Sequence, residues 1–147
     1  MKTTICLILF LPLLSNAQIF TKNDLAICSL SFVAGAANGV EEAIKFHYNR
    51  GFAFVHPNAS RQFWDPRVSY LNKDHSAFTR LLPTFTDGYH LMRGIARTAL
   101  IADVAISVAD FKDKHLLLII AKKFVLSMLA NRAGQYLTYD IIYRERK

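Results

Sequence analysis

The feature that most restricts the fold is an uncharged stretch, residues 25–40, in which small side chains recur at every fourth position. Ser31, Gly35 and Gly39 would share one face of a helix, because four residues make slightly more than one turn. Small side chains on one face let another helix backbone approach closely, as they do in membrane helix pairs. Tight packing in a water-soluble bundle explains the spacing equally well. The stretch therefore predicts a close-packed helix, whose small-residue face could also join two copies of the chain.

This first helix is predicted to begin near Leu25 and to run to about Tyr48. Asn23 and Asp24 precede it and have side chains that can cap a helix N-terminus. Gly51 follows it, and glycine is a common residue just after a helix end. The helix becomes polar at Glu41 and Glu42, directly after the uncharged stretch.

Two further helices are predicted over residues 83–109 and 115–139, the latter extending to Tyr143 at most. Pro83 fits a first helical turn, because that turn leaves its N–H groups unbonded and proline has none. Five apolar residues fall on one face of the second helix: Ile95, Ala99, Ala102, Ile106 and Ala109. Together the three segments predict an all-α bundle of three main helices in a single domain, residues 18–147.

The connection between the first two helices, residues 50–82, has neither helical nor strand periodicity. It is nevertheless rich in aromatic side chains: Phe52, Phe54, Phe63, Trp64, Tyr70 and Phe78. Prolines at positions 57 and 66 mark turns within it. Long segments without regular structure are uncommon in compact domains unless they are functional or disordered. Because of its aromatic content, we expect an ordered connection that packs across the helices.

Residues 1–17 have the pattern of a secretory signal peptide. Lys2 supplies a positive start, an almost unbroken apolar run follows, and Ser15 and Ala17 are small residues at a cleavage position before Gln18. The apolar run is shorter than the roughly 20 residues that a membrane-spanning helix needs. The segment therefore predicts export, with the protein working outside the cytoplasm or in the membrane that it crosses.

Composition leaves the relation to the membrane open. Hydrophobic residues make up 52% of the chain and the mean hydropathy is +0.20. However, Arg93, Arg97 and Asp103 lie within the second helix and Lys122 and Lys123 within the third. Each charge costs roughly 2.5–3.5 kcal/mol at the centre of a span, so clean lipid-exposed spans are not expected for these two helices. The basic residues between the first two helices would suit the cytoplasmic side of a membrane. A membrane-embedded or membrane-attached bundle and an exported soluble bundle both remain possible.

The formal net charge of +7 favours anionic lipid or an acidic envelope polymer as a partner. The basic residues are spread along the chain, and no motif of a nucleic-acid-binding module is present, so no nucleic acid partner is expected. After removal of residues 1–17 the only cysteine is Cys28, which excludes an internal disulfide. A membrane or another helical protein is therefore the expected partner.

One polar stripe suggests chemistry. In a helix that begins at Pro83, Asp87, His90 and Arg97 would share one face, and a carboxylate beside an imidazole is a common metal-ligand pair in helical bundles. The first helix could add Glu42 or His47. These two lie about 140° apart around a regular helix, so they cannot easily hold the same ion. The chain also lacks the second Glu-x-x-His motif that di-metal bundles use.

Two interpretations of this stripe follow. In the first, a divalent metal is held by Glu42, His47, Asp87 and His90 and activates water. Arg93 and Arg97 would then hold an anionic substrate, such as a phosphate ester. In the second, no cofactor is bound, and Asp87 or Glu42 pairs with one of these arginines in a buried network that fixes helix register.

Three stretches resemble a family of small exported or membrane-associated proteins of Bacteroidetes-type bacteria. They are residues 39–50 (Gly-Val-Glu-Glu-Ala-Ile-Lys-Phe-His-Tyr-Asn-Arg), 62–70 (Gln-Phe-Trp-Asp-Pro-Arg-Val-Ser-Tyr) and 86–91 (Thr-Asp-Gly-Tyr-His-Leu). The resemblance implies recurrent patches at six residues: Glu42, His47, Trp64, Asp65, Asp87 and His90. The junction between Ala17 and Gln18 is also similar to the export signals of that group. The resemblance therefore implies a location in the periplasm or the inner membrane, and it carries no activity.

The sequence thus leads to three functional hypotheses. The first is a non-enzymatic, membrane-associated envelope protein that acts through helix packing or partner binding. The second is the small metal-dependent hydrolase described above. The third is a protein that binds lipid or another apolar ligand between its helices.

Overall fold

Three long helices dominate the computed structural model, which describes residues 21–69, 86–109 and 116–144. They are α2 (Lys22–His47), α7 (Gly88–Ala109) and α8 (Leu116–Gln135), and no strand occurs among the described residues. The predicted all-α bundle of three main helices is therefore confirmed. The predicted signal peptide, residues 1–17, lies outside the described residues.

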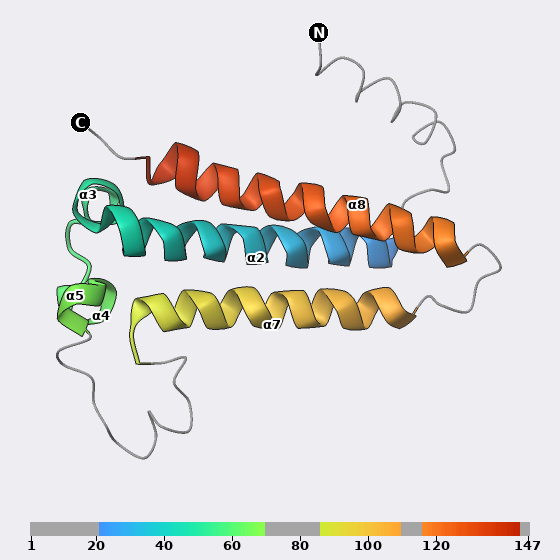
Figure 1. Ribbon diagram of the computed structural model, residues 1–147, viewed down its shortest axis with the longest axis horizontal. Helices are drawn as coiled ribbons and strands as arrows, with labels where there is room; N and C mark the ends of the chain where they lie inside the picture. Colours follow the sequence, from blue (N-terminus) through green and yellow to red (C-terminus); the bar gives the residue numbers. More distant parts are fainter. Residues whose placement is uncertain (1–20, 70–85, 110–115, 145–147) are drawn as a thin grey trace, which may run out of the picture.

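The three helices lie side by side, with α2 in the middle (Figure 1). α2 packs along α7 on one side and along α8 on the other, whereas α7 and α8 have few contacts with each other. α7 runs antiparallel to α2, and α8 runs parallel to α2. The start of α2 therefore lies at the same end of the layer as the end of α7. Each outer helix consequently buries only the stripe that faces α2.

α2 begins at Lys22, earlier than the sequence pattern predicted. Thr21 is its N-cap: the Thr21 hydroxyl accepts from the Asp24 backbone N–H at 3.2 Å, and the Asp24 carboxylate accepts from the Thr21 N–H at 2.7 Å. Such a capping box satisfies two backbone donors that a helix start leaves unbonded. Asp24 is thus part of the cap from inside the first turn rather than a residue before the helix.

The small residues of α2 form its contact with α8. A Cβ atom added at Gly35 would overlap the backbone of Asn131, and one added at Gly39 would overlap the Thr138 hydroxyl. On the facing helix, a Cβ at Gly134 would overlap the Phe32 carbonyl oxygen. The predicted close approach is therefore present, and it joins two helices of the same chain. The stripe that was expected to be able to join two copies is covered within the molecule.

α7 differs from its predicted form at both its start and its buried face. Residues 86 and 87 form a bend, and the helix begins at Gly88; the predicted start at Pro83 lies outside the described residues. Its buried side chains are Ala96, Ala99 and Asp103, whereas Ile95 is 37% exposed. Of the five residues on the predicted apolar face, Ala99 is buried, Ala102 and Ile106 are partly buried and Ile95 is exposed, while the side chain of Ala109 lies outside those described. The most buried side chains of α7 are therefore small or acidic rather than large and apolar.

The connection after α2 is ordered as far as it is described. A π-helical turn, η1 (Tyr48–Phe52), leads through α3 (Ala53–Val55) to the short helices α4 (Arg61–Trp64) and α5 (Pro66–Ser69). The Trp64 ring lies 5.0 Å from the Phe52 ring, between centroids, and fills the space over Gly88 at the start of α7. The expected packing of this aromatic segment across the helices is confirmed for residues 50–69.

The end of α8 completes an aromatic core at the same end of the bundle. The chain continues from α8 into a second π-helical segment, η3 (Tyr136–Ile142), and Tyr143 follows it. Tyr143 stacks on Phe52 with 5.6 Å between ring centroids. Five buried residues form the centre of this core: Ala43, Ile44, Tyr48, Phe52 and Tyr143.

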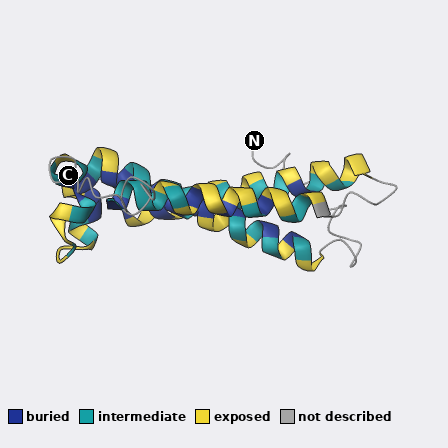
Figure 2. Cartoon of the chain, turned by 90° about the horizontal axis from the view of Figure 1, so that it is seen from below, coloured by how far each residue is buried: buried dark blue, intermediate teal, exposed yellow. Residues whose placement is uncertain are grey.

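The other half of the bundle has an inverted distribution of polarity. Exposed residues run along the outer helices, as Figure 2 shows. Many of them are large and apolar, and we call the following set the apolar band: Leu25, Phe32, Val33, Leu100, Ile101, Val104, Val108, Leu116, Leu117, Leu118, Ile120, Phe124, Met128 and Leu129. Between the same helices lie Asp24, Ser31, Asp103 and Lys123, all buried. None of the helices in the described part of the chain combines the length and apolar character that crossing a membrane requires.

Candidate functional site

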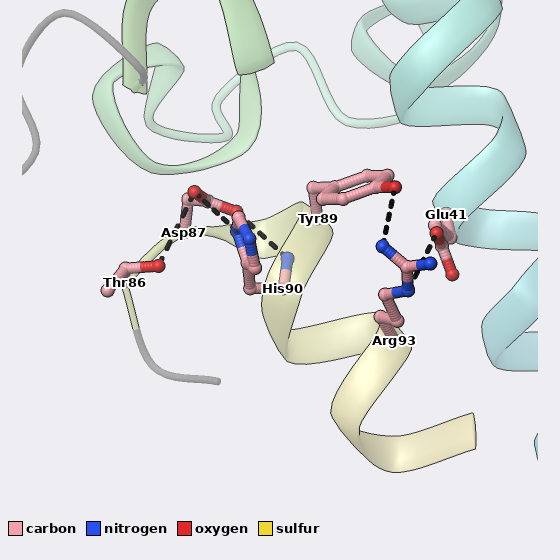
Figure 3. A network of polar contacts seen from close by, with 6 residues as sticks. All are labelled: Glu41, Thr86, Asp87, Tyr89, His90 and Arg93. Atoms are coloured by element: carbon pink, nitrogen blue, oxygen red, sulfur yellow. Dashed lines mark hydrogen bonds and ion pairs between the residues drawn. The ribbon is translucent and has the colours of Figure 1, made fainter. Parts of the chain in front are cut away.

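The predicted Asp87–His90 pair is present, but it caps the start of α7 instead of lying on its face. Asp87 is only 3% exposed and stands directly before Gly88 (Figure 3). Its carboxylate accepts from the backbone N–H of His90 at 2.9 Å, as an N-cap side chain does, and contacts His90 Nδ1 at 2.9 Å. The pair fixes the orientation of the His90 ring, whose side chain is 34% exposed.

Arg93 forms the second contact group of this region. Its Nε atom lies 3.9 Å from Glu41 Oε1, and its NH1 group donates to the Tyr89 hydroxyl at 3.2 Å (Figure 3). Burial raises the pKa of Tyr89, and the neighbouring Glu41 carboxylate raises it further. The arginine that was expected to pair with Asp87 or Glu42 therefore pairs with Glu41, and this ion pair ties α7 to α2.

The other predicted site residues contact different partners. Glu42 accepts from the side-chain amide of Gln135 at 3.1 Å, and His47 Nε2 contacts the Tyr139 hydroxyl at 2.8 Å. Both partners belong to the α8–η3 side of the bundle, whereas Asp87 and His90 lie at the start of α7. Arg97 lies on the exposed side of α7. The structure thus brings together Asp87 with His90 and leaves Glu42 and His47 with separate contacts.

In the described part of the chain no three histidine, cysteine, aspartate or glutamate side chains group closely enough to hold a metal ion. The contacts of Glu42 and His47 agree with their predicted angular separation on the helix. What the Asp87–His90 pair can do on its own is cap a helix and orient an imidazole for hydrogen bonding or proton transfer.

A buried polar cluster in the middle of the bundle joins all three long helices. The hydroxyls of Ser31 on α2 and Ser127 on α8 both donate to the Asp103 carboxylate on α7, the latter at 2.7 Å. The two hydroxyls are themselves 2.7 Å apart. Nearby, the Asn131 side-chain amide donates to the Ser31 carbonyl at 3.2 Å. The cluster gives the carboxylate hydrogen-bond donors from both sides, which buried polar groups need.

Two lysines of α8 also point into the bundle. Lys122 Nζ lies 2.7 Å from Asp24 Oδ2, and the Asp24 side chain is fully buried. Lys123 is 4% exposed and its Nζ donates to the Ser107 carbonyl at 3.3 Å. The charges of Lys122 and Lys123, which argued against a simple membrane span in the sequence, therefore contact protein groups inside the bundle.

The sequence did not predict these inner contacts. Asp24 and Lys122 are 98 positions apart and Ser31 and Asp103 are 72 apart, so no local pattern links them. One signal was available: single charges and hydroxyls recur inside helices that are otherwise apolar. Polar residues of this kind mark the inner side of a helix when its outer side meets an apolar phase.

Comparisons of the chain with protein-family models, with curated proteins and with solved structures give no match.

Proposed function

We propose that the chain is an exported, membrane-associated helical protein of the cell envelope whose apolar band lies among lipid acyl chains. The observation that carries the proposal is the inverted polarity of the bundle. Leu117 is 83% exposed, Ile101 70% and Phe124 67%, while Asp103 and Lys123 are buried. A helix of a water-soluble domain has the opposite arrangement, with its apolar stripe inside and its charges outside.

The extent of the apolar surface favours a lipid phase over a single protein partner. Soluble monomers rarely expose contiguous apolar patches of more than a few hundred Å². Here all three long helices contribute large exposed apolar side chains, including Phe32 of α2, Val104 of α7 and Leu118 of α8. One partner covers one face of a molecule, whereas acyl chains surround it. The band therefore suits lipid better than a single docking interface.

The buried contacts supply the second requirement of a lipid environment. Charged and polar side chains inside a membrane pair with each other or with backbone carbonyls and face the bundle interior. Lys122 forms an ion pair with Asp24, and Lys123 donates to the Ser107 carbonyl. The Asp103 carboxylate accepts from the hydroxyls of Ser31 and Ser127. Polar contacts of this kind stabilise helix association where the hydrophobic effect between helices is absent.

The height of the band limits how the bundle enters the bilayer. From Leu116 to Leu129 the helix rises about 20 Å at 1.5 Å per residue. The hydrocarbon core of a bilayer is about 30 Å thick. The bundle would therefore enter the acyl-chain region with local thinning of the bilayer, or with its aromatic end, outside the apolar band, remaining in the headgroup layer. In this function the protein acts through its packed helices, without bond-making chemistry.

The proposal is tested by flotation of the purified chain with neutral phosphatidylcholine vesicles. The variant Leu117→Gln/Phe124→Gln replaces two exposed apolar side chains of α8, and each fully buried one contributes about 1.5–3 kcal/mol of transfer free energy. We expect the variant to lose membrane binding by more than about tenfold. The control Ala133→Gln changes an exposed residue of the same helix outside the band and should bind like the wild type. Failure of the wild type to float with the vesicles contradicts the proposal.

A further inference from the structure

A pocket of about 490 Å³ lies at the aromatic end of the bundle, where residues of α2, of α7 and of the connection between them meet. Val40 of α2 and Met92 of α7 line it together with residues 55–59 of the connection. Its volume falls within the range of ordinary small-molecule sites, about 300–1,000 Å³. None of the described residues that line it is an acid, a lysine or an arginine, so the pocket suits an uncharged ligand.

Aromatic rings of four lining residues lie together at this pocket: Phe52, His56, Trp64 and Tyr143. The centroid of the Phe52 ring lies 5.0 Å from the centroids of both His56 and Trp64, and 5.6 Å from that of Tyr143. Phe52 and Tyr143 are buried, so packing holds their rings in place. The faces of such rings carry negative charge density, so they favour stacking with a planar ring that is poor in electrons.

Two polar atoms meet at one point of the lining. His56 Nε2 and the Tyr143 hydroxyl are 2.9 Å apart, and both residues line the pocket. Burial raises the pKa of Tyr143, so its hydroxyl keeps its proton at neutral pH. A single ligand oxygen can therefore reach this pair from the pocket.

The pair can either donate to that oxygen or accept from it, because a neutral imidazole nitrogen donates or accepts according to its tautomer. When Nε2 donates to the Tyr143 oxygen, the tyrosine hydroxyl is left to donate to a ligand carbonyl. When Nε2 accepts from the Tyr143 hydroxyl, the tyrosine oxygen is left to accept from a ligand hydroxyl. The pair thus matches an oxygen that is a carbonyl in one state of the ligand and a hydroxyl in the other, as in a quinone and its quinol.

The position of the pocket along the bundle favours a ligand that arrives through the bilayer. At 1.5 Å per residue, Met92 lies about 12 Å along α7 from Leu100 of the apolar band, and Val40 lies about 10 Å along α2 from Val33. An apolar tail of that length links a ring in the pocket to the acyl chains around the band. Met92 is partly buried at the pocket, and its flexible thioether adapts to ligands of irregular shape.

We infer that this pocket binds the head ring of a lipid-soluble quinone. The inference rests on the proposed membrane association, because it takes the ligand from the bilayer that the apolar band contacts. A quinone without an apolar tail offers the same ring chemistry from water, so the experiment includes both sources.

Trp64 provides the readout, because it is the only tryptophan of the chain and it lines the pocket. Quinones quench tryptophan emission on contact. The full chain is titrated with decylubiquinone in phosphatidylcholine vesicles and, in parallel, with duroquinone in buffer. Both quinone rings are fully substituted, so neither adds to the Cys28 thiol. We expect decylubiquinone to quench Trp64 until the emission reaches a plateau, as binding to a single site does.

Two variants test the walls of the pocket, each with a matched control. Tyr143→Phe removes only the hydroxyl of the polar pair and should raise the half-saturating quinone concentration by about three- to tenfold, the worth of one hydrogen bond. Tyr136→Phe removes an exposed hydroxyl in η3 outside the pocket and should bind like the wild type. Ala59→Phe fills part of the pocket and should abolish the plateau, whereas Ala133→Phe at an exposed position outside it should not.

Each other outcome overturns a defined part of the inference. Quenching that rises linearly without a plateau, in vesicles that the wild type binds, would reject the pocket and leave the membrane proposal intact. A plateau that Ala59→Phe does not change would place the quinone elsewhere on the molecule. Equal effects of Tyr143→Phe and Tyr136→Phe would remove the polar pair from recognition. Saturable binding of duroquinone by a chain that does not float with vesicles would assign the pocket to a soluble ligand and reject the membrane proposal. Circular dichroism of all variants checks that the helices are retained.

Discussion

The close contact between α2 and α8 predicts that a glycine-to-alanine substitution lowers the free energy of unfolding, whereas in an exposed helix the same substitution raises it. Replacing a glycine by alanine within an exposed helix stabilises it by about 1 kcal/mol, because glycine loses more backbone entropy on folding. Gly35→Ala should do the opposite. The new Cβ would overlap the carbonyl oxygen, carbonyl carbon and Cα atom of Asn131, all of them backbone atoms of α8.

The size of the effect follows from what must move. No flexible side chain can swing away, so the two helix axes must separate or α8 must bend. Overpacking of this kind costs about 1–3 kcal/mol, and a backbone-to-backbone overlap belongs at the upper end of that range. After subtraction of the helix-propensity gain of about 1 kcal/mol, we expect Gly35→Ala to lower the free energy of unfolding by about 1–2 kcal/mol.

The assay is chemical unfolding followed by circular dichroism, with wild type and variants in the same detergent or buffer. Gly134→Ala should lower stability in the same way, because its Cβ would overlap the Phe32 carbonyl oxygen from the other side of the contact. The matched control is Ala121→Gly on the exposed side of α8, which should cost about 1 kcal/mol from propensity alone. An increase in stability for Gly35→Ala would refute the close contact.

Three further predictions concern single sites. Asp87→Ala removes the N-cap of α7 and should cost about 1–2 kcal/mol in urea unfolding, whereas Asp87→Asn keeps a capping oxygen and should cost less. Asp103→Ala leaves the Ser31 and Ser127 hydroxyls without their shared acceptor and should cost about 1–3 kcal/mol, measured in the same way. Burial raises the pKa of Tyr143 above its ordinary value of 10.0, so its folded form favours the neutral hydroxyl. The raised pKa therefore contributes to the free energy of unfolding below about pH 10, and this contribution is lost as the pH rises through the pKa of the folded state. In an alkaline titration, tyrosinate absorbance should rise together with loss of helix. Titration of Tyr143 at about pH 10 without loss of helix would contradict the prediction.

The sequence predicted the three helices and a close approach of another helix backbone to the small-residue face of α2, because both depend on local spacing. It did not predict that α8 is the helix that approaches. Long segments without an internal proline predict helices, and small residues spaced by four predict close approach. The same local reasoning also predicted that Asp87 and His90 are neighbours. The prediction placed Asp87 and His90 on one face of α7. The helix begins only at Gly88, so Asp87 lies before its first residue and caps it.

The faces of α7 and the polar contacts inside the bundle could not be predicted in the same way. The usual assumption that large apolar residues face inward selected Ile95, which is exposed, and missed Asp103, which is buried. That assumption holds when the surrounding phase is water. The pairs Asp24–Lys122 and Ser31–Asp103 depend on how distant segments meet, which no pattern within one helix contains.

The central claim is that the apolar band contacts acyl chains, and depth-dependent fluorescence quenching tests it most directly. Single cysteines are introduced by Ile101→Cys, Phe124→Cys and, as a control at the aromatic end outside the apolar band, Gln62→Cys. The native cysteines of the chain are replaced by serine. Each is labelled with an environment-sensitive fluorophore in vesicles that carry quenchers on their acyl chains. Strong quenching and blue-shifted emission at positions 101 and 124, with little of either at position 62, is the predicted result. Water-like emission and equal, weak quenching at all three positions would contradict the account.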